Sequence, residues 1–374
     1  LRLFFPWVYR TDIQQAAGDA GDLVSVHAPG GAFLGIGYIN PASEISVRIL
    51  SFSRVEINRD FFRERLLTAF RKREVLAGRT DACRLVHAEA DELPGLIVDD
   101  YAGHLVLQVN TLGMERMQEL LLPELLELRR PKGIYGKSDA ASRRREGLAT
   151  EDRVLHGEIP GRIEIREGGA RFLVSLREGQ KTGFFLDQRR NREIVSSCIN
   201  KGDRVLDVFA HTGAFGIHAA LNGAGRVRLV DASREALALA RENMALNGVS
   251  GEAVRADAFD FLTEAPGTRD RYDLVILDPP PFAKAKRSTA GALKGMRHLI
   301  AQSLRILRPG GLLAVFSCSH HVSQEDLGVA LLEAAADRGG RVEVLEHLFQ
   351  DRDHPQILNI PMSLYLKGFL VRNL

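Results

Sequence analysis

The sequence has little cysteine and no long hydrophobic run. Cys83, Cys198 and Cys318 are widely spaced and odd in number, which fits neither a disulfide framework nor a paired zinc motif. The apolar run Leu312 to Phe316 is far too short to span a bilayer, and the first residues lack a basic region followed by a signal core. We therefore expect a protein of the reducing cytoplasm, with no membrane partner and no metal.

Neither sign of charge dominates. The 374 residues contain 50 Lys+Arg and 48 Asp+Glu, a formal net charge of +2. This balance excludes a histone-like polycation, but it leaves room for local basic patches that bind a polyanion. The composition, 45% hydrophobic and 26% charged, is ordinary for a globular protein, and the length indicates two or three domains.

The N-terminal half shows strand and helix signals of different kinds. Residues 22–50 alternate short β-rich pieces with turns, which predicts a small barrel of strands. Residues 60–76 have helical spacing and predict a linking helix. Residues 84–177 mix strand signals with a Leu-rich helix and predict an α+β region. Within it, the polar segment 137–153, with Arg143 to Arg145, is interpreted as a solvated loop.

From Asn191 onward, strand and helix signals alternate regularly. This alternation predicts an α/β fold with a doubly wound, mostly parallel sheet and helices on both faces. The expected strands are 204–208, 226–230, 253–255, 274–277 and 312–316. The expected helices are 213–221, 234–246, a short one at 259–262, and 293–307.

Three acids follow successive strands of this predicted sheet. Asp207 precedes a turn in which Gly213 lets the backbone approach a ligand closely, which suits a nucleoside cofactor. The full G-x-G-x-x-G pattern is missing, so a pyrophosphate cradle is disfavoured. Asp231 can accept both hydroxyls of a ribose. Asp257, with Ala258, can meet an adenine amino group or can simply cap the next helix.

The fourth strand ends in the segment Asp278-Pro279-Pro280-Pro281-Phe282. Consecutive prolines cannot continue a central ladder, so the chain must leave the sheet and present Asp278 at its rim. There, acceptors can hold the amino group of a planar ring on which Phe282 stacks. The alternative is a simple proline-rich turn.

The fifth strand ends at Cys318, followed by His320 and His321. If strands four and five are neighbours, about 4.8 Å apart, Cys318 lies at the same rim as Asp278. The two histidines could then lower its pKa toward a usable thiolate. Alternatively, Cys318 is a small buried hydrophobe and the histidines are cap or surface residues.

These residues resemble a known family. Asp207 to Phe215, Asp231, Asp257 and the Asp278 to Phe282 segment resemble class I S-adenosylmethionine-dependent methyltransferases. More narrowly, four further segments resemble the bacterial large-subunit ribosomal RNA cytosine-5 methyltransferases of the RlmI and RlmO type: Pro6 to Tyr9, Gly37 to Ser43, Arg84 to Asp99, and Gly179 to Arg189. The similarity covers nearly the whole chain, and Asp353 to Pro355 and Tyr365 to Gly368 resemble that family's terminal hairpin.

The resemblance implies a domain order and partners. It implies a PUA-like RNA-binding domain at 1–70, a central α+β domain at 71–180, and a Rossmann-like methyltransferase domain at 181–374. The implied cofactor is S-adenosylmethionine, and the implied partner is large-subunit (23S) ribosomal RNA. The resemblance also allows a homodimer.

It also implies roles for individual residues. Cys318 would be the nucleophile that adds to carbon 6 of cytosine, and Asp278 would hold the ring and favour protonation at nitrogen 3. Asp187, Gln188 and Arg189 would seat the methionine end of the cofactor, which needs both an acid and a cation. The predicted cofactor site comprises Phe185, Asp187, Gln188, Arg189, Asp207, Ala210, Gly213, Asp231, Ala232, Ser233, Asp257, Ala258 and Asp278. The predicted substrate contacts are Pro279, Pro280 and Phe282, with Lys284 or Lys286 contacting phosphate.

Three other functions share some of these features. Methylation of a guanine nitrogen uses a similar Asp-Pro-Pro-x-Phe loop, but those relatives carry Asn where this chain has Cys318. A non-catalytic RNA-binding or ribosome-assembly factor would not need Asp278 and Cys318. A dehydrogenase is disfavoured because the glycine pattern is incomplete.

Overall fold

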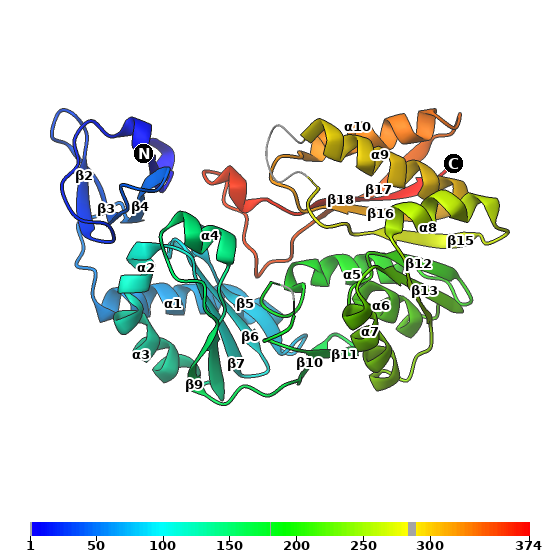
Figure 1. The fold of residues 1–374 in the computed structure, drawn as a ribbon, viewed down its shortest axis with the longest axis horizontal. Coiled ribbons are helices and arrows are strands. Elements are labelled where there is room, and N and C mark those ends of the chain that lie inside the picture. Colours follow the sequence, from blue (N-terminus) through cyan, green and yellow to red (C-terminus); the bar gives the residue numbers. More distant parts are fainter. Residues whose placement is uncertain (1, 180, 283–288) are drawn as a thin grey trace. The chain divides into compact units, whose positions relative to one another are not determined.

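The structure is a computed structural model that describes residues 2–179, 181–282 and 289–374 (Figure 1). It divides into two compact units. The first comprises Leu1–Ile165, Val174–Leu186 and Arg352–Ser363, and the second comprises Arg166–Leu173, Asp187–Asp351 and Leu364–Leu374. The predicted domain boundaries at residues 70 and 180 stay a prediction.

The first unit begins with a small antiparallel sheet. Its strand order is β1-β4-β3-β2, with bounds β1 Trp7–Tyr9, β2 Leu23–His27, β3 Phe33–Ile39 and β4 Ile45–Ser51. Val8, Ile39, Val47 and Ile49 form its small core. The β-rich pieces predicted between residues 22 and 50 are therefore the strands β2, β3 and β4.

A second sheet of the first unit has the order β5-β6-β7-β8-β9. Its strands are β5 Ala82–His87, β6 Leu96–Tyr101, β7 His104–Val109, β8 Gly133–Gly136 and β9 Arg153–Gly157, and the helices are α1 Arg59–Arg73, α2 Leu112–Arg116, α3 Gln118–Arg129 and α4 Ala140–Arg145. Helix α1 begins where Asn58 Oδ1 accepts a 3.1 Å hydrogen bond from the Phe61 amide. It buries Phe62 and Leu66 in the core of this sheet.

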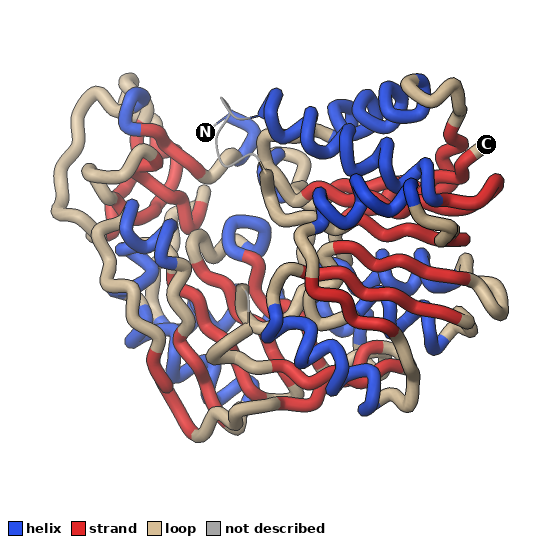
Figure 2. Tube along the Cα trace, turned by 45° about the vertical axis from the view of Figure 1, so that its right-hand side comes forward, coloured by secondary structure: helices blue, strands red, loops and turns tan. Residues whose placement is uncertain are grey.

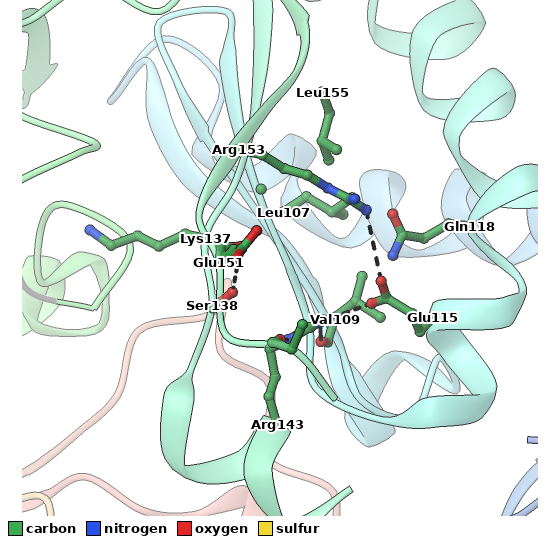
Figure 3. A pocket seen from close by; sticks show the side chains of 12 residues that line it. Leu107, Val109, Glu115, Gln118, Lys137, Ser138, Arg143, Glu151, Arg153 and Leu155 are labelled. Carbon is green, nitrogen blue, oxygen red and sulfur yellow. Dashed lines mark hydrogen bonds and ion pairs between the residues drawn. The ribbon is translucent and has the colours of Figure 1, made fainter. Parts of the chain in front are cut away.

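The polar segment 137–153 is not the solvated loop that was predicted. It contains α4, and the Arg143 side chain is buried, donating to Val109 O at 2.5 Å and to Glu115 at 2.8 Å. Figure 3 shows these side chains, with Arg153 also facing Glu115. Of the three consecutive arginines, Arg144 and Arg145 are exposed, as are most residues from Gly147 to Arg153. The prediction failed because the acceptors for Arg143 come from other elements, which a run of charges in the sequence does not reveal.

The second unit contains a mostly parallel sheet of order β14-β13-β12-β15-β16-β18-β17. The strands are β12 Arg204–Val208, β13 Arg226–Asp231, β14 Glu252–Arg255, β15 Tyr272–Leu277, β16 Leu307–Ser317, β17 Val342–Phe349 and β18 Lys367–Asn373. Strands β14, β13, β12, β15 and β16 run parallel, whereas β18 is antiparallel to both β16 and β17. The predicted doubly wound sheet is confirmed, although β16 begins at Leu307 rather than Leu312.

Helices cover both faces of this sheet (Figures 1 and 2). Helices α6 and α7 pack on one face, and α9 and α10 pack on the other. The bounds are α5 Arg189–Ser197, α6 Ala214–Leu221, α7 Arg234–Leu246, α8 Ala258–Glu264, α9 Thr289–Ile306 and α10 Gln324–Ala336. Leu206, Val275 and Val315, on three strands, lie in the core with Leu299 and Leu327 of the covering helices.

The remaining elements are short. A hairpin is formed by β10 Ile163–Glu167 and β11 Ala170–Val174. The 3-10 helices are η1 Arg2–Phe4, η2 Arg10–Asp12, η3 Glu74–Leu76, η4 Ala88–Asp91, η5 Leu186–Gln188, η6 Ala265–Gly267 and η8 Pro361–Ser363. Across the part of the chain that the structure describes, no helix combines the length and apolarity needed to cross a bilayer.

Candidate active site

The strand order reverses at β12, which has β13 on one side and β15 on the other. Open α/β sheets bind ligands beyond the carboxyl ends of the strands at such a reversal. Asp207 lies in β12, Asp231 ends β13, and Asp278 directly follows β15. The structure thus brings these three predicted acids to one edge of the sheet.

Asp207 is a buried carboxyl group. Its Oδ2 accepts a 3.0 Å hydrogen bond from the amide of Gly216 in α6. Burial, together with the negative charges of Asp278 and Asp231, raises the pKa of Asp207 to about 8. At neutral pH this carboxyl group is therefore mostly protonated and neutral.

Asp231 is held by backbone amides on both oxygens. Its Oδ2 accepts from the His211 amide at 2.8 Å, and its Oδ1 accepts from the Ser233 amide at 2.8 Å. Phe209 and His211, in the loop after β12, have left-handed φ values of 62° and 49°. The carboxylate orientation is therefore fixed, as acceptors for two ribose hydroxyls require.

Gly213 closes the turn between β12 and α6. Its φ is +80°, and a Cβ placed there would lie 2.9 Å from Leu229 Cδ1 and 3.2 Å from Ala240 Cβ. The Gly213 amide donates to Ala210 O at 2.7 Å, which tightens the turn. The glycine is thus needed for the fold of the turn itself.

Two predicted cofactor residues, Asp257 and Ser233, also cap helices. Asp257 Oδ1 accepts a 2.8 Å hydrogen bond from the Phe259 amide and caps α8. Helix capping was the predicted alternative to a contact with adenine. Ser233 Oγ accepts the Ala236 amide at 3.0 Å and caps α7. Ala258 is buried in the core and Ala232 is exposed. Their part in cofactor binding stays a prediction.

Residues 187–189 form a buried polar cluster. Asp187 Oδ2 accepts from the Tyr365 hydroxyl at 2.7 Å, and Arg189 Nη1 donates to Asp351 Oδ2 at 2.6 Å. Gln188 Oε1 accepts from Asn191 Nδ2 at 2.6 Å.

This cluster contains two orphaned polar atoms. Within the described residues, the buried atoms Gln188 Nε2 and Asn191 Oδ1 have no hydrogen-bond partner. A free donor beside a free acceptor suits the carboxylate and ammonium of an amino acid, so the cluster fits the methionine end of the predicted cofactor. Asn191, Asp351 and Tyr365 were not predicted as members of this cluster. Of these three, only Tyr365 lies in a segment, Tyr365 to Gly368, whose resemblance to the family the sequence showed.

Phe185 belongs to the first unit. It is half-buried, and the Lys181 ammonium lies 4.6 Å from its ring centroid.

Cys318 lies beside the proline loop. Its Sγ is 3.9 Å from Pro279 O, which confirms that the ends of β15 and β16 share one rim. The predicted effect of His320 and His321 on the Cys318 thiol stays a prediction. Desolvation and the nearby Lys367 ammonium lower the pKa of His320, which favours its neutral form.

Phe282 contacts other aromatic rings. Its ring centroid lies 6.3 Å from that of Phe209 and 5.7 Å from that of Phe259. An apolar pocket beside it is lined by Pro279, Pro280, Phe282, Ala292, Leu293, Met296, Ser317, Ser319 and Val322. Lys284 and Lys286, predicted to contact phosphate, lie outside the described residues.

A Rossmann-like sheet with acids at three adjacent strand ends and an Asp-Pro-Pro loop defines a class I methyltransferase domain. The family model for S-adenosylmethionine-dependent methyltransferases matches residues 141–372 of this chain, and a PUA-like domain model matches residues 1–52.

Individual proteins are similar over nearly the full length. The enzyme named ribosomal RNA large subunit methyltransferase I from Aeromonas salmonicida is 39% identical, covering 98% of this chain and 95% of the relative. Its namesake from Shewanella denitrificans is 40% identical with the same coverage. A solved structure described as a methyltransferase complexed with SAH (S-adenosylhomocysteine) shares the fold, with a TM-score of 0.87 and 24% identity over 99% of this chain and 96% of that one. The chain belongs to the S-adenosylmethionine-dependent methyltransferase family, with an N-terminal PUA-like domain.

Proposed function

We propose that this protein transfers a methyl group from S-adenosylmethionine to carbon 5 of a cytosine in large-subunit ribosomal RNA. The observation that carries this proposal is the thiol of Cys318, 3.9 Å from the carbonyl oxygen of Pro279 in the Asp-Pro-Pro loop. The names of the relatives from Aeromonas and Shewanella support ribosomal RNA as the substrate. The PUA-like domain supports RNA as the partner.

The chemistry explains why a thiol is needed. S-adenosylmethionine supplies an electrophilic methyl group, but carbon 5 of cytosine is a poor nucleophile. The Cys318 thiolate would add to carbon 6, and the electron pair of the C5–C6 double bond would form the new C–CH3 bond at carbon 5. The methyl–sulfur bond would break at the same time, and its electron pair would stay on the sulfur of the departing thioether. A base then removes the carbon-5 proton, the double bond re-forms, and the S–C6 bond breaks to return the thiolate.

The other residues of the rim would hold the base and the cofactor. Asp278 would favour protonation at nitrogen 3, and the carbonyl oxygens of Pro279 and Pro280 would accept from the exocyclic amino group. Asp187, Gln188 and Arg189 would bind the methionine end of the cofactor, while Asp231 would bind its ribose.

The test is transfer of a labelled methyl group from S-adenosylmethionine to unmodified bacterial 23S ribosomal RNA, with nucleoside mass spectrometry of the product. We expect 5-methylcytosine with the wild type, none with Cys318→Ala, and wild-type activity with the matched control Cys198→Ala. A methylguanosine product, or a Cys318→Ala variant that keeps most of its activity, would contradict the proposal.

A further inference from the structure

The side chain of Lys367 is buried next to Cys318. Strand β18 pairs with β16 so that Lys367 lies opposite Ser317, the residue before Cys318. Lys367 is only 5% exposed, and its Nζ donates a 2.8 Å hydrogen bond to Ser319 O, the carbonyl after Cys318. The backbone of Lys367 therefore lies beside the residue before Cys318, and its ammonium is bonded to the residue after it.

This ammonium lacks the partner that a buried cation usually has. Within the described residues, no carboxylate oxygen lies within 4.0 Å of Lys367 Nζ. Leaving a buried cation without an anion is costly, because burial removes its hydration. Burial accordingly lowers the pKa of Lys367, while negative charge on Cys318, and to a lesser extent on Asp326, opposes this change.

Cys318 is the neighbouring group best placed to serve as the anion of Lys367, because the other titratable neighbours have other partners or are neutral. The Asp326 carboxylate in α10 accepts from the Ser323 amide and hydroxyl, both at 2.8 Å, and so caps its own helix. Desolvation by burial lowers the pKa of the nearby His320, and the charges of Lys367 and His321 add to this, so the neutral form of His320 is favoured. Tyr365, whose ring lies 6.0 Å from that of His320, donates to Asp187.

We propose that Lys367 is a positioning residue that holds Cys318 as a thiolate, an inference that rests on the function proposed above. The thiol proton leaves to solvent, and the sulfur lone pair then forms the bond to carbon 6. When that bond breaks after methyl transfer, its electron pair returns to sulfur beside the ammonium. Lys367 stays protonated throughout, so it changes the energy of the thiolate without itself exchanging a proton.

The test measures the thiol directly and needs no RNA. The full chain is alkylated with iodoacetamide at a series of pH values, and peptide mass spectrometry follows Cys318 and Cys198 in the same digest. In the wild type, we expect a Cys318 midpoint below about 8.5, the value of an ordinary cysteine. Lys367→Met should raise the midpoint by at least about one pH unit and slow alkylation at pH 7 about tenfold. Lys367→Arg, which keeps the charge, should retain most of the wild-type behaviour, and Cys198 should react alike in all three proteins.

Two results would overturn the inference. One is a wild-type midpoint at or above about 8.5, which requires no variant to fold. The other is the same Cys318 profile in wild type and Lys367→Met. A Lys367-dependent midpoint together with a methylguanosine product would support the ion pair and contradict only the proposed function.

Discussion

The carboxylate of Asp231 accepts a 2.8 Å hydrogen bond from the backbone amide of His211, so the end of β13 fixes the loop that follows β12. His211 has a left-handed φ of 49°, a conformation that costs energy for a residue with a Cβ. This bond therefore stabilises a strained loop at the edge where the cofactor is expected. One carboxylate both shapes the site and offers acceptors to the ligand.

Replacing Asp231 should weaken cofactor binding strongly. Asp231→Ala removes a charged acceptor for the ribose and the anchor of the loop, so we expect S-adenosylmethionine affinity to fall about 10-fold to 100-fold. Titration calorimetry measures this loss. Asp257→Ala is the matched control, because Asp257 is exposed and caps α8, and its effect should be smaller. Equal losses of S-adenosylmethionine affinity in the two variants would contradict the special role of Asp231.

The stability of the protein should depend on the ionisation of Asp207. The pKa of Asp207 is raised to about 8 in the folded protein, against about 3.9 in an unfolded chain. Between these values the folded state binds a proton that the unfolded state lacks, so stability falls as pH rises from about 4 to about 8.

The slope that Asp207 contributes is at most about 1.4 kcal/mol per pH unit. Asp207→Asn cannot ionise, so it should flatten the pH dependence in that window. Denaturant unfolding of both proteins at pH 5 and pH 8 checks this. Parallel pH dependences would show that Asp207 is ionised in the folded protein.

Gly213→Ala should destabilise the second unit. The new Cβ would lie 2.9 Å from Leu229 Cδ1 in addition to the strain of a φ of +80°, and we expect a loss of about 1–3 kcal/mol. Gly248→Ala is the control, since Gly248 has a φ of +64° but no atom within 4 Å of the added Cβ. Denaturant unfolding should rank Gly213→Ala as the more harmful change, and the opposite order would contradict the packing argument.

Glu167→Gln should cost more than the loss of a surface pair. Glu167 is buried and accepts from Arg192 at 2.6 and 2.7 Å, so its neutralisation leaves a buried guanidinium without its anion. We expect a loss of about 3–5 kcal/mol in the free energy of unfolding. Glu343→Gln, at a half-exposed pair with Arg372, should change stability by less than about 1 kcal/mol. Similar losses of unfolding free energy in both variants would show that burial of the ion pair does not set its contribution to stability.

The parallel part of the fold could be predicted from the sequence because its signals are local. The strand at 204–208 and the helix at 234–246 have the predicted bounds, since each is an apolar pattern ended by turn or cap residues. The place of β18 between β16 and β17 could not be predicted. It depends on antiparallel pairing between segments that are distant in the sequence, and no local pattern records it.

The parts of the candidate site that depend on neighbouring parallel strands could be predicted, whereas those that depend on distant segments could not. The proximity of Cys318 to the proline loop followed from neighbouring parallel strands, whose carboxyl ends must meet at one edge. Lys367 and Asp351 were missed as members of the site because segments much later in the chain bring them there. Phe282 was predicted to stack on a bound ring, but no local signal showed that Phe209 and Phe259 would already contact it.

The order of the last strands also bears on how the protein is made. During synthesis on a ribosome, β17 emerges before β18, yet β18 is its only neighbour in the sheet as described. Until β18 arrives, β17 has no strand to pair with, and β16 remains an open edge. Lys367 enters with β18, so a nascent chain would carry Cys318 without its ammonium. If Lys367 stabilises the Cys318 thiolate as proposed, the thiol would gain this reactivity only when β18 joins the sheet.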